Sequence, residues 1–288
     1  MTVAHVDLSA ASVVDDVRRA CEEIGFLVVT GHGVDAALVE EVDRLSRAFF
    51  DLPLEEKLRL REGELRPDRP VYRPVESESL GATSGDTPRG DLKESLDYGP
   101  TLPGVGWPAR PPGLEEAYRG YLEAMNQLGG RLRRICARAL GRDEHFFEPL
   151  FDDRASSLRV INYPDVAARP DEGQLRAGAH RDYGFLTILR SENVAGGLEV
   201  QTRAAEWAGV EAPTGSFVVN LGDMLAEWTE GRWVSTLHRV AVPPPGTVGA
   251  RRQSIVFFHN PRADAYVDAL GSTAGEYILA KAAQAFGA

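Results

Sequence analysis

Residues 178–189 read GAHRDYGFLTIL, and the expected fold follows from how the chain continues on both sides of this stretch. The run 185–189 is apolar and partly β-branched, which predicts a short strand. His180 and Asp182 lie two positions apart just before it, so in an extended backbone their side chains point to the same side. An imidazole and a carboxylate held in this way can share a cation. A histidine hydrogen bonded to a neighbouring acid has the same pattern, so the pair alone leaves both roles open.

Further short apolar runs surround this strand in the second half of the chain. Clusters of Gly, Pro, Asn and Asp separate them. Helical patterns do not alternate with these runs, which disfavours a parallel α/β sheet and favours a β-sandwich or barrel. The predicted strands cover residues 157–163, 185–189, 198–201, 217–221, 232–242 and 254–258.

The first half is predicted to be mainly helical, because apolar residues recur there at three- and four-residue steps. The predicted helices cover residues 12–24, 35–50 and 114–140, with a strand at 26–30 and a last helix at 273–285. Residues 63–112 are rich in Pro, Gly, Arg and Asp and show no sustained period. A loop of this length inside a compact domain is either functional or disordered.

We therefore expect one compact unit built from four regions. A helical and strand-containing N-terminal region with the long loop on the substrate side is predicted for residues 1–112, and supporting helices for 113–155. The β core is predicted for residues 156–270 and a C-terminal helix for 271–288.

Composition narrows the class of protein. Of 288 residues, 43% are hydrophobic, and 32 Lys and Arg against 43 Asp and Glu give a net charge of −11. This apolar fraction excludes a disordered chain, and the acidic balance disfavours binding to nucleic acid or to anionic membranes. No run approaches the ~18 apolar residues of a membrane span, and no secretory signal follows Met1. We expect a cytoplasmic protein in which Cys21 and Cys136 are reduced and packed in the core.

A third candidate metal ligand, His238, lies in the extended pattern of residues 233–240. Two histidines and one carboxylate on one face of a metal leave the opposite positions open, which is the arrangement of non-haem Fe(II) sites that use O₂. Zinc would favour thiolate or imidazole ligands in a tetrahedron, and no cysteine is near in sequence.

Arg252 and Ser254 share one face of the predicted strand at the end of the β series. This strand continues as an apolar run, so that face is expected to be buried. A buried guanidinium needs an anionic partner, and its planar fork suits a carboxylate. Either a protein Asp or Glu or a dicarboxylate cosubstrate satisfies this requirement.

Several motifs in this order resemble those of the isopenicillin N synthase-like group of 2-oxoglutarate- and Fe(II)-dependent dioxygenases. The resemblance runs nearly from end to end. Its carriers are GFLVVTGHG (25–33), DLKESLDYG (91–99), NYP (162–164), HRD (180–182), GGLEV (196–200), NLGD (220–223), STLHRV (235–240) and RQS (252–254). Where many relatives carry Arg-Gly-Tyr, this chain has Pro-Val-Tyr at 70–72.

The resemblance implies a double-stranded β-helix (a cupin-like jelly roll) with flanking helices, and it assigns roles to individual residues. It implies that the iron ligands are His180, Asp182 and His238. It also implies that the residues binding 2-oxoglutarate are Arg252, Ser254, Tyr163 and Asn162, although the amide of Asn162 could instead brace the strand. The implied reaction uses O₂ to oxidise a C–H bond of a small molecule and releases succinate and CO₂.

Two alternatives accompany this interpretation. An oxidase of the same family would use Fe(II) and O₂ without 2-oxoglutarate, and its arginine would bind a substrate carboxylate. A non-catalytic jelly-roll binding protein is disfavoured, because the three candidate ligands are all present. We expect a secondary metabolite or an amino-acid derivative as substrate, in a pathway such as antibiotic biosynthesis, and the oligomeric state stays open.

Overall fold

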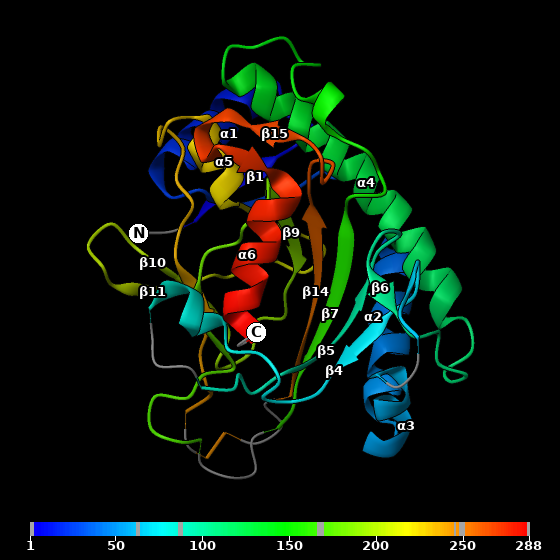
Figure 1. Cartoon of the computed structure of the whole chain (residues 1–288). Coiled ribbons are helices and arrows are strands. Elements are labelled where there is room, and N and C mark those ends of the chain that lie inside the picture. The colour runs from blue at the N-terminus through cyan, green and yellow to red at the C-terminus, as the bar shows by residue number, and fades with distance from the viewer. Residues whose placement is uncertain are drawn as a thin grey trace.

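Two sheets form the framework of the molecule, and helices cover the larger one on its outer face (Figure 1). The computed structural model describes residues 3–61, 64–85, 89–165, 170–244, 246–247 and 251–286. The larger sheet has eight strands in the order β1-β2-β12-β9-β14-β7-β5-β4, and the smaller has four in the order β11-β10-β13-β8. All pairs in these sheets are antiparallel except β1 with β2.

The strands come from both halves of the chain. The large sheet consists of β1 (Ala4–Asp7), β2 (Phe26–Thr30), β12 (Phe217–Leu221), β9 (Leu186–Arg190), β14 (Arg252–His259), β7 (Ser157–Tyr163), β5 (Glu94–Tyr98) and β4 (Val71–Arg73). The small sheet consists of β11 (Trp207–Gly209), β10 (Leu198–Gln201), β13 (His238–Val240) and β8 (Ala177–His180). Two further pairs are β3 (Arg66–Pro67) with β6 (Pro103–Gly104), and β15 (Tyr266–Val267) with β16 (Ser272–Thr273). The predicted jelly-roll core with flanking helices is confirmed.

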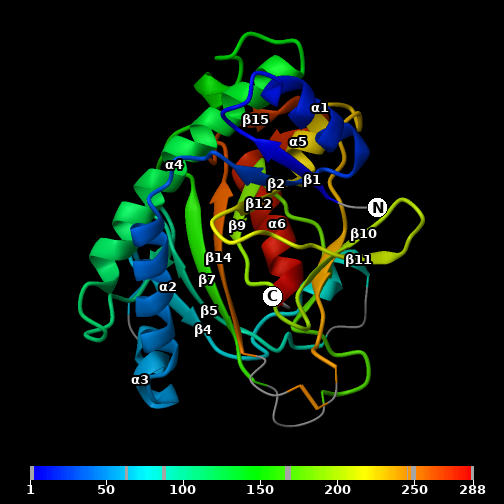
Figure 2. The same cartoon turned by 180° about the vertical axis from the view of Figure 1, so that it is seen from behind.

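The predicted helices are confirmed, and shorter ones join them. The α-helices are α1 (Val13–Glu23), α2 (Ala36–Phe50), α3 (Leu54–Leu58), α4 (Leu114–Ala139), α5 (Asp223–Trp228) and α6 (Ala274–Phe286). The 3₁₀-helices are η1 (Arg59–Arg61), η2 (Leu80–Ser84), η3 (Glu148–Leu150) and η4 (Asp268–Leu270). α4 and α2 lie along the large sheet in both views (Figure 2). In the described part of the chain, no helix combines the length and the hydrophobicity that crossing a membrane requires.

β7 and β14 separate the helix-facing core from the interior between the sheets. Val160 and Ile255 belong to the apolar cluster that includes the buried face of α4. Ile161 and Val256, one position further on each strand, belong to a second cluster between the two sheets. Because side chains alternate along a strand, each of these strands supplies both cores.

The long loop predicted for residues 63–112 is the main point at which the prediction was incomplete. β4 and β5 lie within it and extend the large sheet beyond β7. β5 is buried along its whole length although its sequence is ESLDY, because Glu94 accepts hydrogen bonds from Lys57 and Asn162. Buried and paired carboxylates remove the polar–apolar alternation by which a strand is recognised.

One strand boundary also differs from the prediction, and some short elements were not predicted. The strand predicted for 232–242 is reduced to β13, because residues 232–237 pack without a ladder partner in the described structure. β8 and α5 were not predicted. β8 is only four residues long and is rich in small side chains, so it lacks an apolar period.

Gly25, between α1 and β2, provides a test of how the N-terminal segment supports the β core. Its φ is +66°, and a Cβ there would lie 1.8 Å from the carbonyl oxygen of Val234. Gly25→Ala should therefore lower the free energy of unfolding by clearly more than the ~1–2 kcal/mol that a left-handed backbone costs a residue with a Cβ. The matched control is Gly141→Ala, with φ +73° and no atom within 4 Å of its Cβ. Equal losses in denaturant titrations of the two variants would contradict this contact.

Candidate active site

Three candidate metal ligands meet where β8 and β13 pair. His180 ends β8, and His238, which begins β13, lies directly opposite it in the antiparallel register. The Nε2 atoms of His180 and His238 lie 3.7 Å and 3.8 Å from Oδ1 of Asp182. The three ligand atoms all lie within 4.8 Å of one another. The structure therefore brings together the three residues that the sequence predicted as a metal site.

Hydrogen bonds orient each of these side chains toward a common point. Nδ1 of His180 donates to the carbonyl of Gly178 at 2.8 Å, and Nδ1 of His238 donates to the carbonyl of Thr236 at 3.1 Å. Both Nε2 atoms are then left as acceptors facing Asp182. Such partners behind the ligand fix the tautomer and the direction of metal-binding imidazoles.

Asp182 is held in the same way. Its Oδ2 accepts a hydrogen bond of 2.6 Å from Nδ2 of Asn220 on β12, which leaves Oδ1 facing the two imidazoles. Asn220 was quoted in a sequence motif, but this role was not predicted. The sequence signal that could have indicated this role is a polar amide near the end of an otherwise apolar strand.

The protonation states suit metal binding. Burial is the main reason why the pKa of His180 lies far below its ordinary value, and the neighbouring His238 lowers it further. This imidazole is therefore neutral. Burial raises the pKa of Asp182, but His238, His180 and the hydrogen bond from Asn220 lower it more, so the carboxyl is ionised. Neutral imidazole and carboxylate are the forms that bind divalent metals.

Arg252 is a fully buried cation in the same cavity. Its Nη1 donates to Oγ of Ser254 at 2.6 Å and its Nη2 to Oγ of Ser191 at 2.7 Å, while its Nε has no partner. Among the described residues, no carboxylate forms an ion pair with it. The sequence allowed either a protein Asp or Glu or a dicarboxylate cosubstrate as the partner of Arg252. Within the described ranges, no such protein acid is found.

Tyr163 lies next to this cation, whereas Asn162 does not. The centre of the Tyr163 ring is 4.9 Å from the guanidinium carbon of Arg252. Asn162 is on the opposite face of β7, where its amide nitrogen donates to Glu94 at 2.8 Å and its oxygen accepts from Arg251 at 2.8 Å. The expectation that Asn162 contacts the cosubstrate is therefore corrected, because strand alternation turns it away from the cavity.

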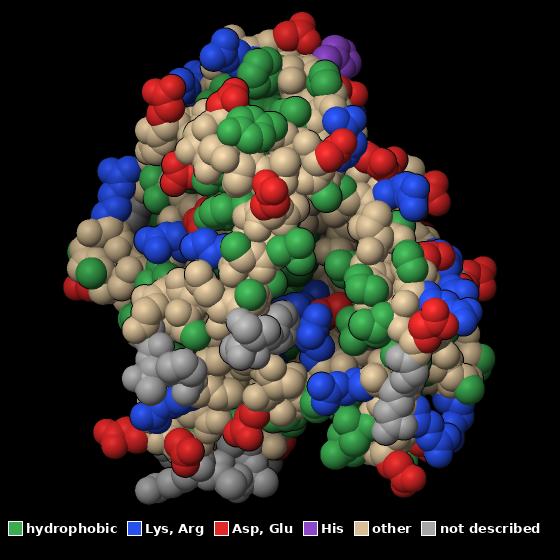
Figure 3. Space-filling view, viewed as in Figure 1, with side chains coloured by type: hydrophobic (Ala, Val, Ile, Leu, Met, Phe, Trp, Pro, Cys, Tyr) green, Lys and Arg blue, Asp and Glu red, His purple; other side chains and the backbone are tan. Residues whose placement is uncertain are grey.

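The cavity that contains these groups has a volume of about 410 Å³ and lies between the two sheets. The wall around Arg252 and the candidate ligands is mostly apolar. It is formed by Phe26, Ile161, Leu189, Leu198, Val240 and Val256. In the space-filling view, the face that carries α6 is hollowed beside this helix, with charged side chains in the hollow (Figure 3). A cavity of this size suits a small molecule.

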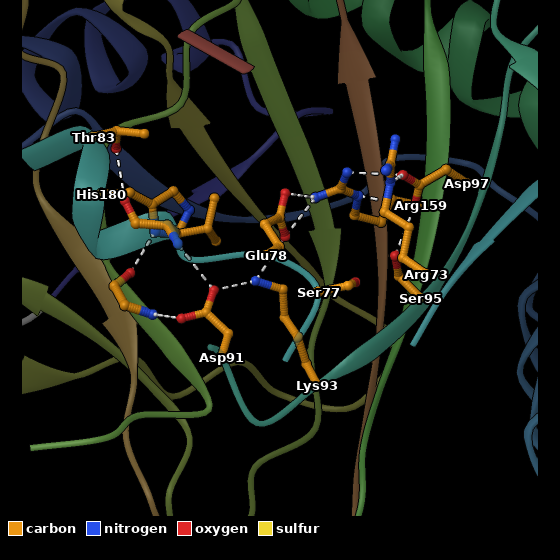
Figure 4. Close-up of polar contacts among 12 residues, drawn as sticks. Arg73, Ser77, Glu78, Thr83, Asp91, Lys93, Ser95, Asp97, Arg159 and His180 are labelled. Atoms are coloured by element: carbon orange, nitrogen blue, oxygen red, sulfur yellow. Dashed lines mark hydrogen bonds and ion pairs between the residues drawn. The ribbon is translucent and has the colours of Figure 1, made fainter. Parts of the chain in front are cut away.

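A second group of cavity residues was not predicted. Five charged side chains form one polar wall, and all of them are shown in Figure 4: Arg73, Glu78, Lys93, Asp97 and Arg159. Only Arg159, a charge within the apolar strand β7, was visible as an irregularity in the sequence.

Comparison with known proteins agrees with this geometry. Residues 3–126 match the family described as the non-haem dioxygenase in morphine synthesis N-terminal region, and residues 155–261 match the 2OG-Fe(II) oxygenase superfamily. Validamycin A dioxygenase of Streptomyces hygroscopicus subsp. limoneus is 30% identical over 95% of this chain and 81% of its own length. A homoarginine-6-hydroxylase of Oryza sativa subsp. japonica is 33% identical, over 91% and 80% of the two chains.

Solved structures give the same result. A full-length protein of Neurospora crassa, in complex with alpha-KG (2-oxoglutarate) and thymine, superposes with a TM-score of 0.83 at 25% identity, covering 98% of this chain and 96% of that one. A putative 2OG-Fe(II) oxygenase family protein from Caulobacter crescentus gives a TM-score of 0.79 at 27% identity, over 97% and 98% of the chains.

These findings set aside both alternatives, the oxidase that works without 2-oxoglutarate and the non-catalytic binding protein. The chain belongs to the isopenicillin N synthase-like family of Fe(II)- and 2-oxoglutarate-dependent dioxygenases, enzymes that act on small molecules.

Proposed function

We propose that His180, Asp182 and His238 bind the Fe(II) of this dioxygenase and that Arg252, with Ser254 and Tyr163, binds 2-oxoglutarate. The observation that carries the proposal is a fully buried Arg252 with no anionic partner among the described residues, in the same cavity as the three ligands. An unpaired buried charge costs several kcal/mol, and a bound anion at this site would remove that cost.

The donor set fits the cofactors. Two imidazoles and one carboxylate on one side leave the opposite positions for a cosubstrate and O₂. The carboxylate of 2-oxoglutarate that is remote from its keto group matches Arg252, whose planar fork binds carboxylates in pairs of hydrogen bonds. When bound, iron and 2-oxoglutarate supply the oxidation of a substrate C–H bond, with release of succinate and CO₂.

The residues around the site then have defined tasks. Asn220 holds Asp182 in the direction of the ligands, and the carbonyls of Gly178 and Thr236 hold the two imidazoles. Leu189 and Val256 belong to the apolar wall of the same cavity and exclude water from the charges of the site. A dry environment strengthens the charge interactions within the site.

We further propose that the substrate is a secondary metabolite or an amino-acid derivative, in a pathway such as antibiotic biosynthesis, and that the enzyme acts in the cytoplasm. The relatives named for homoarginine and for validamycin A support the substrate class. The two cysteines, which are buried and unpaired, are typical of a reducing compartment.

Removal of the carboxylate ligand tests the iron site. Asp182→Ala should lose stoichiometric Fe(II) and succinate production. Two imidazoles alone bind the metal weakly, and no carboxylate remains to neutralise its charge. Iron content after desalting and succinate release measure this. Asp264→Ala, which removes an exposed acid paired with Arg262, is the control and should keep both. Full iron occupancy in Asp182→Ala would reject the assignment.

Replacement of the buried cation tests the cosubstrate site. Arg252→Met should leave iron binding intact and weaken 2-oxoglutarate roughly 10²–10³-fold, because one partner of a buried ion pair is removed. The protein should stay folded, since none of the described acids loses its partner. Arg251→Met is the matched control, because Arg251 points to Asn162 and Asp51 instead. Calorimetric titration that finds equal 2-oxoglutarate affinities in the two variants would overturn the role of Arg252.

A further inference from the structure

One wall of the cavity is a connected array of charges that the binding of iron and 2-oxoglutarate does not use (Figure 4). Three cations alternate with three carboxylates. In order they are Arg73, Asp97, Arg159, Glu78, Lys93 and Asp91. All except Asp91, which lies behind Lys93, line the cavity. Replacing such buried ion pairs by apolar residues is often neutral or stabilising, so stability alone does not account for them.

The carboxylates of this array are already saturated. Asp97 accepts four hydrogen bonds, from Nε of Arg73 at 2.8 Å, from Nε and Nη2 of Arg159 at 2.9 and 2.8 Å, and from Ser95 at 2.9 Å. A carboxylate has about four acceptor sites. Asp97 therefore has no capacity left for a group of the substrate.

Glu78 is occupied as well. It accepts from Nη1 of Arg159 at 3.0 and 3.2 Å, and Nζ of Lys93 lies 2.8 Å from its Oε2. The two acids that line this wall are thus turned toward protein cations and are not offered to a ligand.

Two of the three cations are more exposed than these acids, whereas Lys93 is as buried as they are. The side chain of Arg73 is 32% exposed and that of Arg159 16%, whereas Asp97 and Glu78 are only 5% and 6% exposed. Because both guanidinium groups bind the same Asp97, they lie side by side. Among the described residues of this wall, a molecule that enters the cavity therefore meets more guanidinium surface than carboxylate surface. Two adjacent guanidinium groups with exposed surface can bind an anion.

This anion is distinct from the carboxylate of 2-oxoglutarate. Along β7, Arg159 lies four residues from Tyr163, which is about 13 Å of strand. The cross-strand partners confirm the separation, since Tyr163 pairs with Arg252 and Arg159 with Val256. One 2-oxoglutarate molecule whose tail is at Arg252 does not occupy the two guanidinium groups at the other end of the cavity. The substrate can therefore reach them.

The remaining part of the cavity is apolar. α6 contributes Ile278, Leu279 and Ala282, and Phe258 and Leu102 complete this surface. Leu279 is 71% exposed, so the apolar surface continues from the cavity to the outside of the molecule. An aliphatic body fits here, whereas a polyol would lose hydrogen bonds to water without replacement.

We propose that the substrate is a small aliphatic carboxylic acid, including amino acids of this type, whose carboxylate binds between Arg73 and Arg159 while its aliphatic part lies along α6. The inference rests on the proposed function, because it takes His180, Asp182 and His238 in the same cavity as the iron site. Arg73 and Arg159 are then the residues that determine specificity for an acid.

A set of matched probes tests this class without knowledge of the natural substrate. The probes are short aliphatic acids and L-amino acids, such as hexanoate and L-norleucine, each with its carboxamide. Calorimetry and the visible absorption of the enzyme loaded anaerobically with Fe(II) and 2-oxoglutarate report binding. We expect acids to bind at least about tenfold more tightly than their carboxamides. Equal binding of acids and carboxamides, or binding of no acid in the set, would overturn the proposal.

Variants of the exposed cation connect this preference to the wall. Arg73→Gln should remove the preference for the acid, and Arg73→Lys should restore part of it, because the charge returns without the guanidinium fork. Arg66→Gln, an exposed position on β3, should change nothing. An unchanged preference in Arg73→Gln would contradict the assignment.

The affinity for 2-oxoglutarate, measured in the same titrations, separates the two levels of inference. It should be equal in the wild-type enzyme and in Arg73→Gln. If 2-oxoglutarate fails to bind the wild-type enzyme, the proposed function fails. If it binds and no acid does, only the substrate class fails.

Discussion

The pairing of β8 with β13 is the constraint on which the candidate site depends. Both strands are short, and their register places His238 opposite His180. An antiparallel pair holds the Cβ atoms of opposite residues about 5 Å apart. The two imidazole rings therefore lie together, with their centres 4.3 Å apart. Small shifts of this register would separate the two ligands. The contacts of Gly25 with Val234 and of Thr236 with Ile24 hold the segment before β13 against β2 and α1.

The cavity is divided by charge into two ends with different energetics. At one end, Arg252 is buried without an anion from the described residues, and the protein bears the cost of this charge until a ligand neutralises it. Ligand binding should stabilise the folded state by mass action, since only the folded chain offers this site. At the other end, the charges of the wall compensate one another before any ligand arrives.

The charged wall is also connected to the metal ligands. Lys93 pairs with Glu78 and Asp91, and Oδ1 of Asp91 accepts the backbone N–H of Gly178 at 2.9 Å. The carbonyl of the same Gly178 accepts the hydrogen bond of His180. One residue of β8 thus lies between the polar wall and an imidazole of the site. The stretch containing Asp91, which the sequence showed as a motif within a long loop, supports the position of β8.

The sequence alone determined the local properties: the helices at their periodic positions, most strands of the core, the three candidate ligands and the cation Arg252. The helices, the strands and the His180–Asp182 pair depend on residue type and short spacing, whereas the roles of His238 and Arg252 came from the resemblance of the motifs around them. The tertiary structure alone decided which face of each strand turns to the cavity. β7 and β5 are buried on both faces over most of their length, so their sequences lack a polar–apolar alternation. Such an alternation would have shown that Arg159 faces the cavity and that Asn162 faces the other side of the sheet. The polar wall likewise joins side chains from four separate segments, and only packing brings them to one surface.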